Sequence, residues 1–136
     1  MKIVLDENAI MPTRAHSTDA GLDLYSREDK VIHGNSSDTF DTGVHIELPE
    51  GTAGFLKSKS GLNIKHNITS DGVVDVGYTG SIVVKLYNHG VKSYKVSKGD
   101  KITQLVVVNI ETPELELVDS LNDTERGEGG FGSTGK

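Results

Sequence analysis

Short apolar runs of period two recur along the chain and restrict it to folds made of β-strands. In VHIELP, residues 44–49, apolar and polar residues alternate, as in a strand that buries one face. Similar runs, separated by clusters of Gly, Asp, Asn and Ser, occur at 2–5, 53–58, 81–88, 101–110 and 115–118. Many short strands with frequent turn signals predict an all-β sandwich or barrel. The pattern leaves room for one helix, a turn or two around 61–66.

The apolar pattern stops after Val118, which predicts a compact β domain at 1–118 and a mobile C-terminal arm at 119–136. A length of 136 residues suits one domain with a hydrophobic core.

No apolar run approaches the roughly 18 residues of a membrane span, and acidic residues come too early for a signal peptide. A soluble protein is therefore expected. The lack of cysteine fits a reducing compartment such as the cytoplasm.

The charge balance bears on possible partners. The formal net charge is −6, and the 14 Lys and Arg residues are scattered along the chain. Stable binding of DNA or RNA is therefore not expected. A small polyphosphate remains a suitable ligand, because local amides, a few basic groups and a divalent cation can neutralise it.

The chain ends in GGFGSTGK, which matches most of the phosphate-binding P-loop pattern. A P-loop needs a buried strand before it and a helix after it, and this segment has neither, so that reading fails. Gly-rich termini are usually disordered. However, Arg126 and Phe131 among five glycines also suit a flap that closes over an anion and a flat ring.

Two segments in the first half of the chain carry candidate binding groups. In AGLDLYS, Asp23 stands between two leucines, either as a surface residue of an edge strand or as a ligand that meets Mg²⁺ through water. In SKSGL, Lys59, Ser60 and Gly61 lead from a strand into the candidate helix. They suit an anion site, although Ser and Gly at such a turn are also ordinary capping residues.

Two later segments carry further candidates. In GVVDVGYTG, Asp75 interrupts an apolar run, and Tyr78 lies between two glycines in an expected hairpin. Asp75 is either a turn residue or a carboxylate at a pocket mouth that orients a water molecule for attack. In GDKITQL, Gln104 is polar among apolar neighbours, so it either satisfies neighbouring backbone groups or contacts a ligand.

Taken in order, AGLDLYS, SKSGL, GVVDVGYTG, GDKITQL and RGEGGFGSTG resemble the five motifs of the homotrimeric dUTPases, the deoxyuridine triphosphate nucleotidohydrolases. The resemblance runs from about Pro12 to Gly135, and the last motif matches at every fixed position. It implies a distorted jelly-roll β-barrel and a homotrimer with active sites at subunit interfaces. It also implies Mg²⁺-assisted hydrolysis of dUTP to dUMP and pyrophosphate, with the arm closing over a neighbouring subunit's site.

The resemblance also assigns roles to individual residues. Asp75 would orient the water that attacks the α-phosphorus, and Tyr78 would pack under the deoxyribose and leave no room for a 2′-hydroxyl. The backbone of Gly72, Val73 and Val74 would recognise uracil. The remaining assignments are Asp23 for Mg²⁺ through water, Lys59, Ser60, Gly61 and Gln104 for the phosphates, Phe131 for stacking on uracil, and Arg126, Gly132, Ser133 and Thr134 for closure over the nucleotide.

The sequence departs from the family pattern at two positions of these motifs. Lys59 replaces the usual Arg and loses its bidentate fork. Ser81 follows Gly80 where the third motif often has Glu, and the connection across 63–71 looks short. Two other functions on the same fold are a dCTP deaminase and a nucleotide-responsive binding protein. Asp75 and the complete arm favour the hydrolase, in the cytoplasm or in the host cytoplasm if the chain is viral.

Overall fold

The computed structural model describes residues 1–135 and contains ten strands and one helix. In chain order they are β1 (Lys2–Leu5), β2 (Gly21–Tyr25), β3 (Lys30–Ile32), β4 (Ser36–Asp41), β5 (Val44–Glu47), β6 (Thr52–Lys57), α1 (Ser60–His66), β7 (Ile68–Val74), β8 (Val83–Asn88), β9 (Tyr94–Val96) and β10 (Lys101–Asn109). The expectation of an all-β fold is confirmed.

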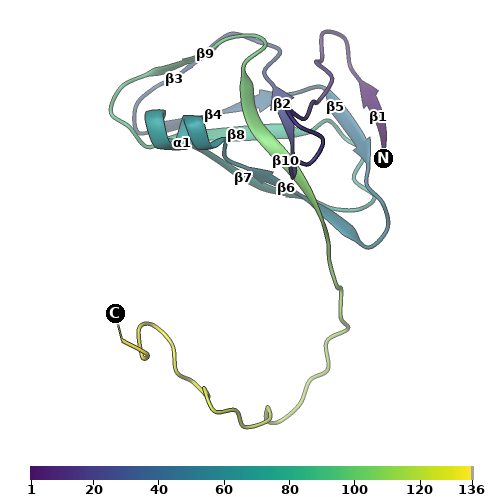
Figure 1. Ribbon diagram of the computed structural model, residues 1–136, viewed down its shortest axis with the longest axis vertical. Helices are drawn as coiled ribbons and strands as arrows, with labels where there is room; N and C mark the ends of the chain where they lie inside the picture. Colours follow the sequence, from purple (N-terminus) through teal and green to yellow (C-terminus); the bar gives the residue numbers. More distant parts are fainter. Residues whose placement is uncertain (136) are drawn as a thin grey trace.

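The strands form one large antiparallel sheet and two small ones. The large sheet has six strands in the order β2-β10-β6-β7-β8-β4, and the pairs β1-β5 and β3-β9 complete the body. The pairing within each sheet is antiparallel. Figure 1 shows the strands curling around a common interior, with α1 at one end of the body.

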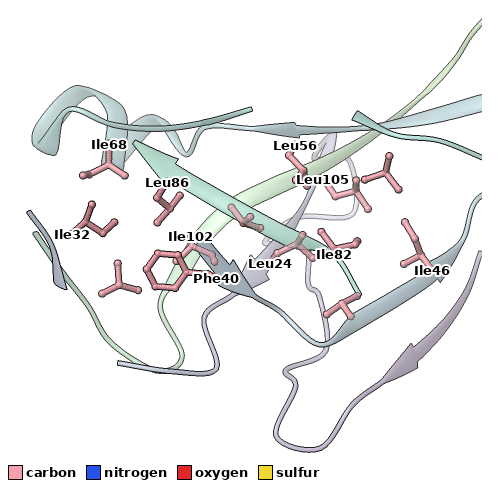
Figure 2. Close-up of a cluster of buried hydrophobic side chains, with 14 of the residues drawn as sticks. Leu24, Ile32, Phe40, Ile46, Leu56, Ile68, Ile82, Leu86, Ile102 and Leu105 are labelled. Carbon is pink, nitrogen blue, oxygen red and sulfur yellow. The ribbon is translucent and has the colours of Figure 1, made fainter. Parts of the chain in front are cut away.

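Alternation along the strands builds the core. In β8, Val84 and Leu86 are buried, whereas Val83, Lys85 and Tyr87 face outward. Side chains from most of the strands meet in the same interior, as Figure 2 shows for ten labelled residues. Burial of such side chains is the main favourable term in folding. The period-two pattern of the sequence therefore reflects one buried face per strand.

The single helix lies where the sequence predicts it. α1 follows Lys59, and it ends at Asn67, whose left-handed backbone (φ 57°) lets its N–H reach the carbonyl oxygens of Asn63 and Leu62. None of its residues is buried. The helix turns the chain between the antiparallel neighbours β6 and β7. Within the described chain no helix is long and apolar enough to cross a membrane.

The strand expected over 115–118 is wrong. Regular structure ends with β10 at Asn109, and Leu115 and Leu117 are fully exposed. Alternation alone cannot make a strand, because a strand needs a partner for its backbone groups. Beyond the hydrogen bond from the Ile110 N–H to the Gly51 carbonyl oxygen (3.0 Å), the chain runs away from the body as an extended segment (Figure 1).

Candidate functional site

A pocket of about 290 Å³ opens between β7 and β8. The structure pairs β7 with β8 over Ile68–Ser70 only, although β8 extends back to Val83 and pairs with β4 along its whole length on its other side. Further along β7, residues 71–75 line the pocket together with Tyr78, Ile82, Val83, Lys85 and Leu56. On this side, the backbone N–H and C=O groups of Gly72 to Val74 have no strand beside them among the described residues, so they can bond the edge of a planar ligand.

Asp75 and Tyr78 lie at the rim of this β7–β8 pocket. The Tyr78 N–H bonds the Asp75 carbonyl oxygen at 3.2 Å, which closes a turn, and the Tyr78 hydroxyl donates to the Ser81 carbonyl oxygen at 3.0 Å. The ring folds over Gly80, where an added Cβ would lie 2.5 Å from the Tyr78 oxygen. Tyr78 keeps 49% of its surface exposed, so the pocket rim offers a carboxylate and an aromatic face together.

A second group of predicted residues gathers where β2, β10 and the end of β6 meet. The side chain of Asp23 is only 7% exposed, and it forms ion pairs with Lys59 through Oδ1 and with Lys101 through Oδ2 (2.8 Å). Burial opposes ionisation of this carboxyl, but the hydrogen bonds from Lys101 and Lys59 outweigh it and lower the pKa of Asp23. We call Asp23, Lys59 and Lys101 the lysine cluster.

The lowered pKa of Asp23 predicts a pH-dependent contribution to stability. The contribution is present above the ordinary carboxyl pKa of about 4 and is lost as the pH falls through the lowered pKa of the folded state. Asp23→Asn should therefore lower the free energy of unfolding by about 1–3 kcal/mol at pH 7, and much less near pH 2. Urea denaturation at both pH values measures this difference.

The exposed ion pair of Asp71 with Lys57 provides the control, since both side chains are more than half exposed. Asp71→Asn should have a smaller effect at pH 7, because solvent screens exposed pairs. If both variants lose the same free energy of unfolding at pH 7, the burial of Asp23 does not strengthen its ion pairs.

Gln104 and the start of α1 lie beside the lysine cluster. The Gln104 side-chain amide donates to the Ser58 carbonyl oxygen at 3.1 Å, and Gln104 is the register partner of Asp23. Gln104 therefore satisfies neighbouring backbone, one of the two alternatives that the sequence left open. Ser60 and Gly61 form the first turn of α1, and a Cβ on Gly61 would meet no other atom within 4 Å, so this turn has space for a ligand.

The arm holds a third group. Arg126 Nε donates to the Gly129 carbonyl oxygen at 2.8 Å, and the Ser133 N–H bonds the Gly130 carbonyl oxygen at 3.0 Å. Phe131 is fully exposed, with a positive φ of 50° that is uncommon for an aromatic residue. Figure 1 shows this part of the chain far from the strands. The arm therefore presents its ring and guanidinium without a partner from the body.

One chain does not bring the three groups together. Lys57 of β6 pairs with Asp71 and Gly54 pairs with Val74, so Ser60 and Asp75 lie beyond opposite ends of this paired stretch. At about 3.3 Å per residue along a strand, Ser60 and Asp75 are roughly 20 Å apart. The β7–β8 pocket and the lysine cluster are thus separate parts of the surface of one chain.

Sequence reasoning missed several residues that the structure places at these sites. Lys101 neutralises Asp23, and its position directly after the Gly99-Asp100 turn, at the start of a strand, was the available signal. Asp41 and His45 contact the residues on either side of Gly80, and nothing in the local sequence of either residue indicates that contact.

Comparison with known proteins identifies the family. The dUTPase family model matches residues 7–135. A deoxyuridine 5'-triphosphate nucleotidohydrolase of Clostridium tetani (strain Massachusetts / E88) is 45% identical over 136 residues, which is 98% of this chain and 94% of that protein. The enzyme of the same name from Gloeothece citriformis (strain PCC 7424) is 48% identical over 96% of this chain and 92% of its own length.

Solved structures show the same fold. The Staphylococcus bacteriophage 80alpha dUTPase with dUPNHPP superposes with a TM-score of 0.93 at 34% identity, over 99% of this chain and 98% of that chain. A dUTPase from phage phi11 of S. aureus, described with a structural Mg(II) ion, gives a TM-score of 0.84 at 31% identity, over 90% of this chain and 98% of that chain. Sequence and fold agree over nearly the full length, and the chain belongs to the dUTPase family.

Proposed function

We infer that the protein hydrolyses dUTP to dUMP and pyrophosphate, which keeps uracil out of DNA and supplies dUMP for dTMP synthesis. Its membership of the dUTPase family supports the reaction. The observation that carries the proposal is the β7–β8 pocket, where unpaired backbone groups, Asp75 and Tyr78 meet. This arrangement can hold a flat base and a sugar beside a carboxylate.

Asp75 is the proposed catalytic residue. Its carboxylate is exposed at the pocket rim, where it can accept a proton from a water molecule and orient its oxygen toward the α-phosphorus. Attack forms the new P–O bond, breaks the bond between the α-phosphorus and the bridging oxygen, and releases pyrophosphate. A positioned base of this kind contributes about 10²–10⁴-fold to the rate, and charge stabilisation supplies much of the rest.

Base and sugar recognition belong to the same pocket. The unpaired backbone groups of Gly72, Val73 and Val74 would bond the edge of uracil, and cytosine would present a donor where uracil presents an acceptor. Tyr78, held over Gly80, would pack under the deoxyribose and leave no room for a 2′-hydroxyl. On closure of the arm Phe131 would stack on uracil.

The phosphates would bind at the start of α1, beside the lysine cluster. Ser60 and Gly61 form the open first turn of α1 after Lys59, where backbone N–H groups and an ammonium can hold anionic oxygens. Gln104 would exchange its hydrogen bond to the Ser58 carbonyl oxygen for one to a phosphate. Arg126, Gly132, Ser133 and Thr134 of the arm would add donors near the γ-phosphate. A closed arm would also exclude bulk water from the reacting atoms.

Mg²⁺ is the proposed cofactor, and the residues restrict how it can bind. The described chain has no group of three or more His, Cys, Asp or Glu side chains that could hold a metal ion, and both Asp23 oxygens already accept from lysines. The donor set therefore fits a cation held mainly by phosphate oxygens and water, which Mg²⁺ favours. Each Asp23 oxygen accepts from one lysine and has a further lone pair, so Asp23 can also accept from a metal-bound water. The ion would neutralise the triphosphate charge.

A homotrimer is proposed because one chain separates Asp75 from Ser60 by roughly 20 Å of strand. In the proposed trimer a second subunit brings its lysine cluster and α1 to the β7–β8 pocket, and the arm comes from a neighbouring subunit. Closed symmetric oligomers commonly build sites in this way. We further propose that the trimer works in the cytoplasm, or in the host cytoplasm for a viral chain.

Pyrophosphate release from dUTP, dCTP, dTTP and UTP with Mg²⁺ tests the function. We expect turnover of dUTP alone, because each competitor fails one contact: dCTP at the base edge, dTTP through its methyl group and UTP at Tyr78. Equal turnover of dUTP and UTP would contradict the assigned role of Tyr78. A folded protein without turnover of any nucleotide would instead favour the alternative, a nucleotide-responsive binding protein.

A further inference from the structure

A polar network holds the segment that follows Asp75 and carries Tyr78. His45 Nδ1 lies 2.8 Å from the Thr79 carbonyl oxygen, and its Nε2 lies 3.1 Å from Oδ1 of Asp6. Both partners are acceptors, so both contacts are hydrogen bonds only when the ring is an imidazolium. The Thr79 carbonyl and the Asp6 carboxylate accordingly raise the pKa of His45.

The other side of Gly80 is held by a second contact. The Ser81 hydroxyl donates to Oδ1 of Asp41, and the Gly43 N–H bonds the same oxygen at 3.0 Å. The hydrogen bond from Ser81, together with those from Gly43 and Arg27, lowers the pKa of Asp41 and keeps it ionised. Ser81 stands where the family motif often has Glu. The contact with Asp41 is therefore made by a residue at which this chain differs from the motif.

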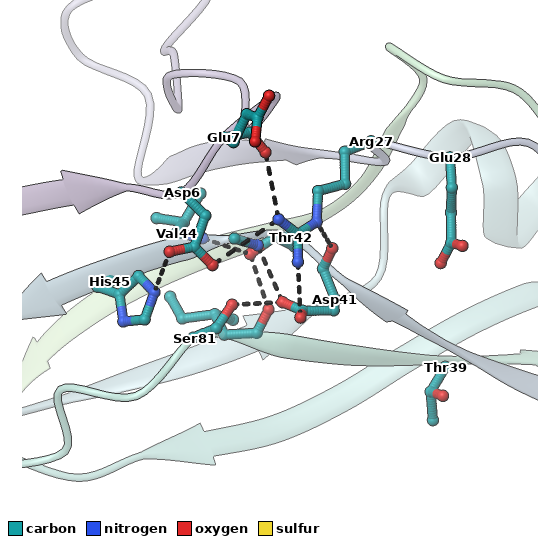
Figure 3. Close-up of polar contacts among 12 residues, drawn as sticks. Asp6, Glu7, Arg27, Glu28, Thr39, Asp41, Thr42, Val44, His45 and Ser81 are labelled. Atoms are coloured by element: carbon teal, nitrogen blue, oxygen red, sulfur yellow. Dashed lines mark hydrogen bonds and ion pairs between the residues drawn. The ribbon is translucent and has the colours of Figure 1, made fainter.

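Arg27 joins the two contacts into one network, which Figure 3 shows. Its Nη2 lies 2.7 Å from Oδ2 of Asp41, its Nη1 lies 3.7 Å from Oδ2 of Asp6, and its Nε donates to the Asp41 carbonyl oxygen at 2.8 Å. The side chain of Arg27 is 24% exposed, so the guanidinium is only partly screened by water. A continuous series of contacts thus runs from Thr79 through His45, Asp6, Arg27 and Asp41 to Ser81.

The network surrounds the residue on which Tyr78 rests. Thr79 and Ser81 flank Gly80, and the Tyr78 ring packs on Gly80 with its hydroxyl bonded to the Ser81 carbonyl oxygen. A shift of Thr79 or Ser81 must therefore move the support of the ring. Ile82 is anchored independently, because its carbonyl oxygen accepts from the Thr42 hydroxyl at 2.7 Å.

We propose that His45 and Asp41 are positioning residues that, through Thr79 and Ser81, hold Tyr78 where it discriminates dUTP from UTP. They touch neither base nor sugar and act only through the segment after Asp75. The inference rests on the proposed function, and it extends that function by naming what sets sugar specificity. A ring held from both sides of Gly80 can exclude a 2′-hydroxyl, whereas a loosely held ring can move aside.

The variants Ser81→Ala and His45→Phe test this proposal, because each removes one contact and leaves the Thr42 anchor in place. Loss of a hydrogen bond to a charged partner should lower the ratio of kcat/KM for dUTP over UTP about fivefold to tenfold, mainly because kcat/KM for UTP rises once the ring can move aside. Ser81→Thr keeps the hydroxyl and should restore the wild-type ratio. A lower Tm alone would reflect a structural role, so Tm is measured for every variant.

The matched controls are Ser93→Ala and His33→Phe. Ser93 and His33 form a serine–histidine contact of 3.3 Å elsewhere on the surface, and both should keep the wild-type nucleotide ratio. If Ser81→Ala and His45→Phe change only Tm, the network is purely structural and the proposal is wrong. Absence of dUTP turnover in the unmodified protein would instead overturn the proposed function, and calorimetry with dUPNHPP and its ribose counterpart would still measure sugar discrimination.

Discussion

Asp75→Asn should reduce kcat for dUTP by about 10²–10⁴-fold, because the amide cannot accept the proton of the attacking water. Nucleotide affinity should change little. Asn has nearly the same size as Asp. The hydrogen bond that closes the turn, from the Tyr78 N–H, is accepted by the backbone carbonyl oxygen of Asp75 and does not involve the side chain. Pyrophosphate release measures the loss of turnover, and calorimetry with dUPNHPP measures retained binding.

Asp71→Asn is the matched control for Asp75. Asp71 also lines the β7–β8 pocket. Its carboxylate is paired with Lys57 at 3.2 Å, so we do not expect it to orient the attacking water. This variant should keep most of the wild-type kcat. Near-normal turnover of Asp75→Asn, or an equal loss in both variants, would remove Asp75 from its assigned role.

Truncation after Val118 should nearly abolish turnover without unfolding the β domain. The arm would supply the stacking ring, the guanidinium and the exclusion of water, and positioning effects of this kind are worth well over 10²-fold. The hydrogen bonds that the structure shows for residues 119–135 are all within that segment. The Tm should therefore stay near that of the full chain, as measured by thermal unfolding followed by circular dichroism.

Mixed trimers distinguish an arm that acts on a neighbour from one that acts on its own subunit. Chains with Asp75→Asn and chains truncated after Val118 are each inactive alone. If Asp75 and the arm of one site come from different subunits, random mixing by co-refolding should restore activity at about a quarter of the sites. If the arm closes over its own subunit, mixing restores nothing, and the proposed exchange between subunits is wrong.

The sequence was a good guide to local structure. Period-two alternation identified β1, β5, β6, β8 and β10, and the SKSGL segment identified α1. The pattern works because one buried face per strand imposes it on the sequence. It failed at 115–118, where alternation is present but no strand offers its backbone groups as partners.

The sequence also indicated which residues belong to the candidate site, but not how they are arranged. Asp75 and Tyr78 share a pocket rim because they lie three positions apart in one turn, and the sequence indicates so short a separation directly. The ion pair of Lys101 with Asp23 joins distant strands. Only the register of β10 against β2 brings them together, and no local pattern specifies that register.

Residue types and short spacings were enough to predict the all-β class, the one short helix and the ordered motifs that mark the family. Only the folded chain shows that β7 separates from β8 after Ser70 to open a pocket, and that the ion pairs of Asp23 with Lys59 and Lys101 lie outside its lining. It also shows that His45 and Asp41 hold the segment beneath Tyr78. The physical reason is that strand pairing and charge contacts join residues far apart in the chain, so their partners exist only once the sheet has closed.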